Sequence, residues 1–74
     1  MRNALTLTLN GEQREFPALN GAGLSVLGLL TALGLDTRKV AVERNEEIVP
    51  RSHYTETWLA SGDQLEIVHF IGGG

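Results

Sequence analysis

The first seventeen residues carry the pattern that most limits how this chain can fold. Residues 4–9 (ALTLTL) alternate apolar and polar side chains with a period of two, which is typical of a strand with one buried face. Asn10-Gly11 follows directly, and both residue types tolerate the positive φ angles of a type I′ turn. Residues 12–16 form the returning strand, which Pro17 ends because proline cannot donate to a strand ladder. The chain is therefore predicted to begin with a β-hairpin.

An amphipathic helix is predicted after a glycine-containing loop. Its apolar residues repeat with the spacing i, i+3, i+4 and i+7, namely Val26, Leu29, Leu30 and Leu33. Ser25 precedes them and is suited to accept a backbone N–H of the first turn. Gly34 follows them and supplies the left-handed residue that ends many helices.

The rest of the chain is predicted to add strands at residues 40–44, 48–49 and 64–70. Turn sequences separate these stretches, namely Asn45-Glu46 and Ser61-Gly62-Asp63. The segment at residues 51–59 is expected to be irregular or briefly helical. Its larger side chains are expected to join the core, namely Tyr54, Trp58 and Leu59.

The order strand, strand, helix, strand, short strand, strand predicts an α+β domain. The arrangement is that of the ubiquitin-like β-grasp fold: a mixed four- to five-stranded sheet with one main helix packed across one face. We expect residues 1–70 to form this domain and residues 71–74 to form a flexible C-terminal glycine tail. Because one fold hosts many activities, function must be argued from a site.

Composition excludes several classes of function. The chain has no cysteine, which excludes a thiol nucleophile and a zinc–thiolate site and fits a reducing compartment. The net charge of −3 gives no basic surface for nucleic acid or for anionic membranes. No apolar run is long enough for a bilayer and no signal peptide is visible, so a cytoplasmic location is expected.

No group of residues is predicted to form a catalytic or metal site. His53 and His69 have no clustered partners at metal-ligand spacing, and Ser25 lacks the neighbouring base that a nucleophile needs. Gly21-Ala22-Gly23 begins like a dinucleotide-binding loop, but the sixth position is Val26 rather than glycine. We therefore expect a protein that is not an enzyme by itself and that binds no cofactor.

The last four residues, Ile71-Gly72-Gly73-Gly74, are the most informative for function. Glycine lacks a Cβ, so this segment is thin enough to enter a narrow cleft. Fully extended, it projects roughly 13–14 Å, at about 3.3–3.6 Å per residue. The carboxylate of Gly74 is ionised at neutral pH and available to attack an activated phosphate. The residues alone leave two alternatives, a carboxyl terminus delivered into another protein's active site or a frayed end.

The last strand suggests a docking surface beside this tail. Its period of two points Leu65 and Ile67 toward the helix and places Val68 and Phe70 on the solvent side of the sheet. Ala41 is expected on the same side. An exposed apolar patch next to the tail would suit a partner protein.

Several stretches carry a resemblance to a known family: residues 42–45 (VERN), residues 48–51 (IVPR) with Tyr54, residues 62–68 (GDQLEIV) and the Gly-Gly-Gly end. They resemble the ThiS family, the sulfur carrier proteins of thiamine biosynthesis. The resemblance covers most of the chain from Ser25 onward and is strongest from residue 40 to residue 74.

The resemblance implies a reaction sequence at Gly74. A ThiF-type, E1-like activating enzyme would adenylate its carboxylate with MgATP, and a sulfur donor protein would then displace AMP to leave a thiocarboxylate. A ThiG-type thiazole synthase would take this sulfur into the thiazole ring. Gly73 and Gly74 would be the reactive end, and Ala41, Val68 and Phe70 would belong to the docking surface.

Three alternatives remain beside this interpretation. The small subunit of molybdopterin synthase also ends in glycines on a β-grasp domain, but it usually carries prolines before the tail, where this chain has His69-Phe70-Ile71. A ubiquitin-like modifier would join Gly74 to a lysine of a target protein. A plain interaction module would not need the tail.

Overall fold

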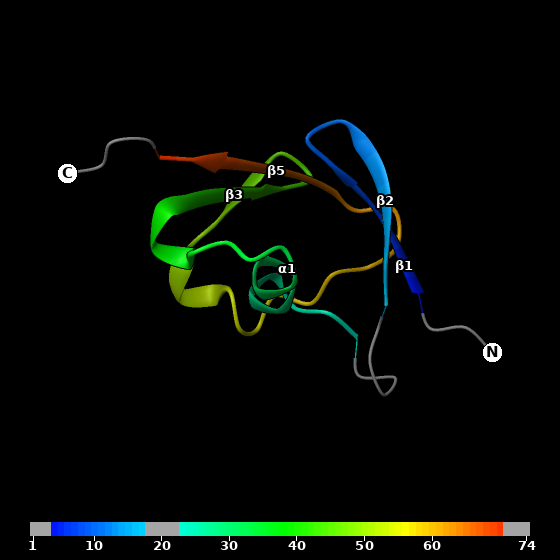
Figure 1. Cartoon of the computed structure of the whole chain (residues 1–74), viewed down its shortest axis with the longest axis horizontal. Helices are drawn as coiled ribbons and strands as arrows, with labels where there is room; N and C mark the ends of the chain where they lie inside the picture. Colours follow the sequence, from blue (N-terminus) through cyan, green and yellow to red (C-terminus); the bar gives the residue numbers. More distant parts are fainter. Residues whose placement is uncertain (1–3, 18–22, 71–74) are drawn as a thin grey trace.

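The computed structural model describes residues 4–17 and 23–70. In chain order the elements are β1 (Ala4–Leu9), β2 (Glu12–Pro17), α1 (Val26–Ala32), the 3₁₀ turn η2 (Thr37–Lys39), β3 (Val40–Arg44), β4 (Glu47–Val49), the 3₁₀ turn η3 (Arg51–His53) and β5 (Gln64–His69). The sheet has five strands in the order β2-β1-β5-β3-β4, and α1 lies on one of its faces (Figure 1). The β1–β5 pair is parallel and the other pairs are antiparallel, which confirms the predicted mixed sheet.

The N-terminal hairpin is as predicted. Asn10 and Gly11 have φ angles of 49° and 85°, so both turn residues adopt the left-handed region that a type I′ turn requires. Strand β2 runs one residue further than expected, to Pro17, which pairs with Ala4. Proline is tolerated there because β2 is an edge strand of the sheet.

Helix α1 begins and ends close to the predicted residues. The Oγ of Ser25 accepts a hydrogen bond from the N–H of Gly28 at 3.0 Å, which confirms the expected N-cap. Gly34 has a φ of 73°, and the next N–H, that of Leu35, donates to the carbonyl of Leu30 at 2.9 Å. Leu33, the last residue of the predicted stripe, is the C-cap and is only partly buried.

One hydrophobic core lies between α1 and the sheet. Its buried members come from every strand, the helix and the segment before β5: Leu7, Leu9, Phe16, Val26, Leu29, Leu30, Val40, Val42, Val49, Tyr54, Leu59 and Leu65. Tyr54 and Leu59 were expected in this core and are buried. Since apolar burial contributes roughly 25 cal/mol per Å², this set supplies the main stabilisation of a chain without disulfides.

The prediction that Trp58 joins the core was wrong, because 55% of its surface is exposed. Trp58 pairs with Ser25 in an isolated antiparallel bridge, so the backbone is extended at this point. Successive side chains of an extended segment point to opposite sides, and the neighbouring Leu59 takes the core side. The indole therefore faces outward.

No helix in residues 4–17 and 23–70 is long and apolar enough to cross a membrane. The predicted tail at residues 71–74 lies outside the described part of the chain. The last residue that the structure places before it is Phe70, which directly follows β5.

Candidate functional site

The predicted docking residues lie on the sheet face opposite α1, which we call the open face. In the β3–β5 register Ala41 is opposite Val68, and both alternate with residues of the core. Val68 is 55% exposed and Phe70 is 50% exposed, as the period of two predicted. A role of these three residues in docking remains a prediction, as does the role of Ile71, Gly72, Gly73 and Gly74, which lie outside the described residues.

The open face also contains an apolar residue that the sequence analysis missed. Ile48 is 74% exposed and lies opposite Glu43, which in turn lies opposite Glu66 on β5. The buried neighbour Val49 was the available signal, since alternation sends Ile48 to the other face. The open face therefore has two adjacent rows, Ile48-Glu43-Glu66 and Ala41-Val68, with Phe70 beyond the second row.

The two glutamates of the first row are a directly opposed pair of like charges. Such cross-strand pairs are destabilising by a few tenths of a kcal/mol to about 1 kcal/mol. Glu43 and Glu66 are both exposed, so water screens much of their repulsion. The open face is consequently apolar toward Phe70 and acidic toward the β3–β4 turn.

The start of β5 is fixed by a buried carboxylate. Asp63 is 7% exposed, and its side chain accepts hydrogen bonds from Arg44 Nε at 2.9 Å, Asn45 Nδ2 at 3.1 Å and the backbone N–H of Ala60 at 2.8 Å. Burial raises the pKa of this carboxyl, but the hydrogen bonds from Ala60, Arg44 and Asn45 outweigh it, so the pKa lies below the ordinary value. Asp63 is therefore charged at neutral pH and ties the β3–β4 turn to β5.

Asn45 completes this connection through its backbone and its amide oxygen. Its N–H donates to the carbonyl of Gln64 at 2.7 Å, and its Oδ1 accepts the N–H of Gln64 at 2.9 Å. The φ of Asn45 is 53°, a conformation that asparagine adopts more readily than most residues. The sequence analysis placed Asn45 and Asp63 in turns and in the stretches that resemble the family, but it did not foresee that their side chains join β3 to β5.

The middle of β5 is held by a side chain where the main-chain ladder stops. Strand β1 pairs with β5 only at Thr8 and Leu9, because the chain then turns into the hairpin. Beyond Leu9 the side-chain amide of Asn10 binds the backbone of β5 instead. Its Oδ1 accepts the N–H of Ile67 at 2.8 Å, and its Nδ2 donates to the carbonyl of Ile67 at 3.2 Å. Asn10 thus serves both the turn and the strand that leads to the tail.

The end of β5 is held by η2. The N–H of Phe70 donates to the carbonyl of Lys39 at 2.8 Å, and η2 itself is capped by Asp36, whose Oδ1 accepts the N–H of Arg38 at 2.9 Å. Hydrogen bonds from Arg38 lower the pKa of Asp36 to about 2. Because Arg38 is exposed and Asp36 is only half-buried, the ionic part of the pair adds little to stability.

Potential metal ligands are scattered in the part of the chain that the structure describes. No group of three or more potential metal ligands occurs in residues 4–17 and 23–70, and His53 and His69 are both exposed. A separate apolar groove lies between β2 and α1, lined by residues that include Phe16, Leu24 and Leu27, and no residue of β3 or β5 lines it. The features that the structure describes just before residue 71 are thus an exposed apolar patch and a strand held by several hydrogen bonds.

Comparison with known proteins identifies the family. The family model described as "ThiS family" matches residues 7–74, which is more than half of the chain. The chain belongs to the ThiS family. The sulfur carrier protein ThiS of Bacillus subtilis (strain 168) is 40% identical to it over 68 residues, which cover 92% of this chain and 98% of that protein.

Solved structures and longer relatives extend the comparison. The crystal structure of the thiamine biosynthesis protein ThiS from Geobacter metallireducens superposes with a TM-score of 0.73 at 36% identity, and the match covers 95% of this chain and all of that one. A computationally designed protein based on human erythrocytic ubiquitin gives a TM-score of 0.54 at 17% identity, which supports the ubiquitin-like fold alone. A thiazole synthase of Paramagnetospirillum magneticum is 54% identical over 70 residues, and this ThiS-family chain spans about a fifth of its length (20%).

Proposed function

We propose that this ThiS-family chain is a sulfur carrier of thiamine biosynthesis, with the carboxylate of Gly74 as its reacting group. The observation that carries the proposal is the match to the B. subtilis sulfur carrier along 98% of that protein, together with a family match that runs through residue 74.

The proposed chemistry uses the carrier as a substrate of other proteins. The Gly74 carboxylate attacks the α-phosphorus of ATP, pyrophosphate leaves, and an acyl adenylate forms in a ThiF-type activating enzyme that binds the MgATP. Sulfide delivered by a sulfur donor protein then attacks the acyl carbon, AMP leaves with the bonding electrons, and a thiocarboxylate remains. Adenylation is needed because a carboxylate is a poor electrophile without a good leaving group.

A ThiG-type thiazole synthase is the proposed acceptor of the sulfur. Support comes from the 54% and 47% identity of this chain to parts of two proteins named thiazole synthase. The open face beside Phe70 is the proposed docking surface for both enzymes, because it is apolar and lies at the root of the tail.

Intact-protein mass spectrometry tests this function directly. The chain would be incubated with a ThiF-type enzyme, MgATP and a sulfide source, and a mass gain equal to one oxygen exchanged for one sulfur is expected. Addition of thiazole synthase together with the substrates that supply the rest of the thiazole ring should discharge the sulfur, whereas molybdopterin synthase partners should not. Higher-mass conjugates, or no ATP-dependent change with an active enzyme, would instead favour a modifier or a plain interaction module.

The docking surface yields a separate prediction for Phe70→Ala. Because half of the Phe70 surface is exposed, the variant should keep the wild-type melting temperature. Loss of a central aromatic anchor should raise the KM of the activating enzyme for the carrier about tenfold or more. Steady-state kinetics with varied carrier concentration measure this effect.

Trp58→Ala is the matched control, since Trp58 is similarly exposed but belongs to the segment that pairs with Ser25 before α1. Its KM should stay close to that of the wild type. Equal KM values for Phe70→Ala and wild type would contradict the docking assignment.

A further inference from the structure

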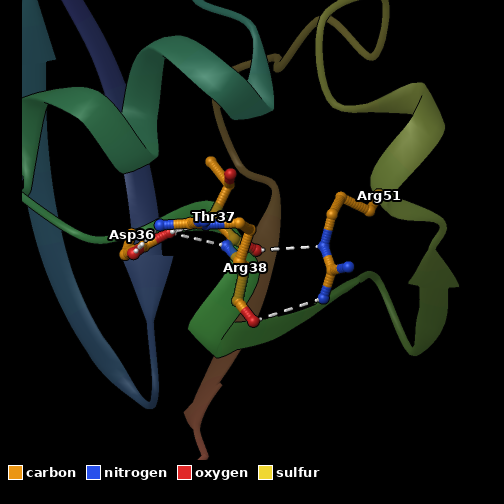
Figure 2. A network of polar contacts seen from close by, with 4 residues as sticks. All are labelled: Asp36, Thr37, Arg38 and Arg51. Atoms are coloured by element: carbon orange, nitrogen blue, oxygen red, sulfur yellow. Dashed lines mark hydrogen bonds and ion pairs between the residues drawn. The ribbon is translucent and has the colours of Figure 1, made fainter.

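The short turns η2 and η3 meet beside the end of β5 through one arginine side chain. Arg51 begins η3, and its Nε donates to the carbonyl of Thr37 at 3.1 Å while its Nη2 donates to the carbonyl of Arg38 at 3.5 Å. Figure 2 shows the guanidinium reaching across to these two carbonyls of η2. The contact joins segments separated by 13 and 14 residues of chain.

Arg51 binds the carbonyls of Thr37 and Arg38, the first two residues of η2. A 3₁₀ turn of three residues has few internal hydrogen bonds, so these additional donors help to hold it. Asp36 caps the N-terminal end of η2, through the N–H of Arg38. The planar guanidinium presents several donors in a fixed fork, so one side chain can bind two consecutive carbonyls.

The backbone of Arg51 is anchored to the core, which makes it a firm support for η2. Val49, two residues earlier, is buried, and the carbonyl of Arg51 accepts the N–H of the buried Tyr54 at 3.1 Å. The next carbonyl after the two that Arg51 binds is that of Lys39, which accepts the N–H of Phe70 at 2.8 Å. A continuous set of bonds therefore runs from the core through Arg51 and η2 to Phe70.

We propose that Arg51 is a positioning residue for the sulfur-transfer end of the chain: it fixes η2, and η2 fixes the residue from which the tail departs. The proposal rests on the proposed function, because it concerns how the tail is presented to the activating enzyme. Arg51 acts through η2. Its loss keeps the Phe70 side chain available for docking but should reduce the fraction of bound carriers whose tail is placed for attack on ATP.

Hydrogen exchange measures the structural half of the proposal without any partner enzyme. In Arg51→Ala the amide of Phe70 should exchange about tenfold faster than in the wild type, which is the effect of losing bonds of this kind. The amides of Val42 and Ile67, further from η2, should change little, and the melting temperature should stay within a few degrees. An unchanged exchange rate at Phe70 would overturn the proposal.

Two further variants separate positioning from a simple charge effect. Arg51→Lys keeps the positive charge but replaces the planar fork by a single ammonium group, so it should behave like Arg51→Ala. Lys39→Ala removes a neighbouring exposed cation but keeps the backbone carbonyl at position 39. In this variant the amide of Phe70 should therefore exchange at the wild-type rate. Wild-type behaviour of Arg51→Lys together with a defect in Lys39→Ala would assign the effect to charge and reject the proposal.

The effect of Arg51 on tail placement is tested by measuring the ATP-dependent release of pyrophosphate by the activating enzyme. Both Arg51 variants should lower kcat about tenfold, because a loosened Phe70 places the tail for attack less often. Their KM should rise less than that of Phe70→Ala, because the Phe70 side chain is still present. An unchanged kcat in Arg51→Ala would overturn the proposal. If the wild-type chain itself is not activated, the proposed function fails, and the exchange experiment alone decides whether Arg51 holds Phe70.

Discussion

Removal of Gly74 is expected to abolish the ATP-dependent mass gain completely while leaving the fold unchanged. The shortened chain still ends in a carboxylate, that of Gly73, but the reacting group is withdrawn by one residue, about 3.3–3.6 Å along an extended tail. A misplacement of even 1 Å at a reacting centre can cost on the order of a hundredfold in rate. Intact-mass measurement tests the loss of the mass gain, and the melting temperature tests whether the fold is unchanged.

A chain with one extra glycine after Gly74 is the matched control. It keeps every residue of the native sequence and a terminal carboxylate, but it moves that carboxylate outward by the same distance. If the active site of the activating enzyme accepts a tail of one length only, both the shortened and the lengthened chain should fail to load sulfur. Sulfur loading of the chain that lacks Gly74 would contradict the assignment of the reacting group.

Asp63→Asn is expected to cause the largest loss of stability among single substitutions at polar residues described here. Every group that contacts the Asp63 carboxylate is a donor, on Arg44, Asn45 and Ala60. Oδ2 accepts from Arg44 and Ala60 and Oδ1 accepts from Asn45, so an asparagine turns its NH₂ group toward at least one of these donors. We expect the free energy of unfolding to fall by roughly 2–4 kcal/mol. The total for a domain of this size is only about 4–11 kcal/mol, and urea denaturation at pH 7 measures the difference.

The pH dependence of the difference in unfolding free energy between wild type and Asp63→Asn tests whether the charged Asp63 carboxylate causes it. Because the pKa of Asp63 is lowered in the folded state, its contribution is fully present above the ordinary aspartate pKa of about 3.9 and is lost as the pH falls through the lowered value. The gap between wild type and Asp63→Asn should therefore narrow below about pH 4. Asp36→Asn, at a half-buried carboxylate whose partner Arg38 is exposed, should lower the free energy of unfolding much less at pH 7. If the difference in unfolding free energy grew as the pH fell, it could not come from the ionised, hydrogen-bonded carboxylate of Asp63.

Local patterns were sufficient to predict most of the fold. The turn at Asn10-Gly11, the cap at Ser25 and the end of α1 at Gly34 depend on neighbouring residues, so sequence alone could place them. Trp58 was misplaced because a large apolar residue was assumed to be buried, whereas the extended backbone allowed only one of Trp58 and Leu59 to face the core.

The features that hold β5 were harder to foresee because they join residues far apart in sequence. Asp63 lies 19 residues from Arg44, Asn10 lies 57 residues from Ile67, and Arg51 lies 14 residues from Thr37. Each is an ordinary turn or surface residue in its local context, and only the strand register brings the partners together. Exposure of Val68 and Phe70, by contrast, followed directly from alternation along one strand.

The central position of β5 has a consequence for the synthesis of the protein. This strand is synthesised after the other four described strands, yet it lies between β1 and β3 and, in the part of the chain that the structure describes, joins the N-terminal hairpin to the β3–β4 pair (Figure 1). Until residues 64–69 emerge, the two halves of the sheet have no common neighbour, and such distant pairings close late. A nascent chain that stalls before β5 therefore exposes its apolar residues instead of folding, so the sheet and the strand that leads into the tail are completed together.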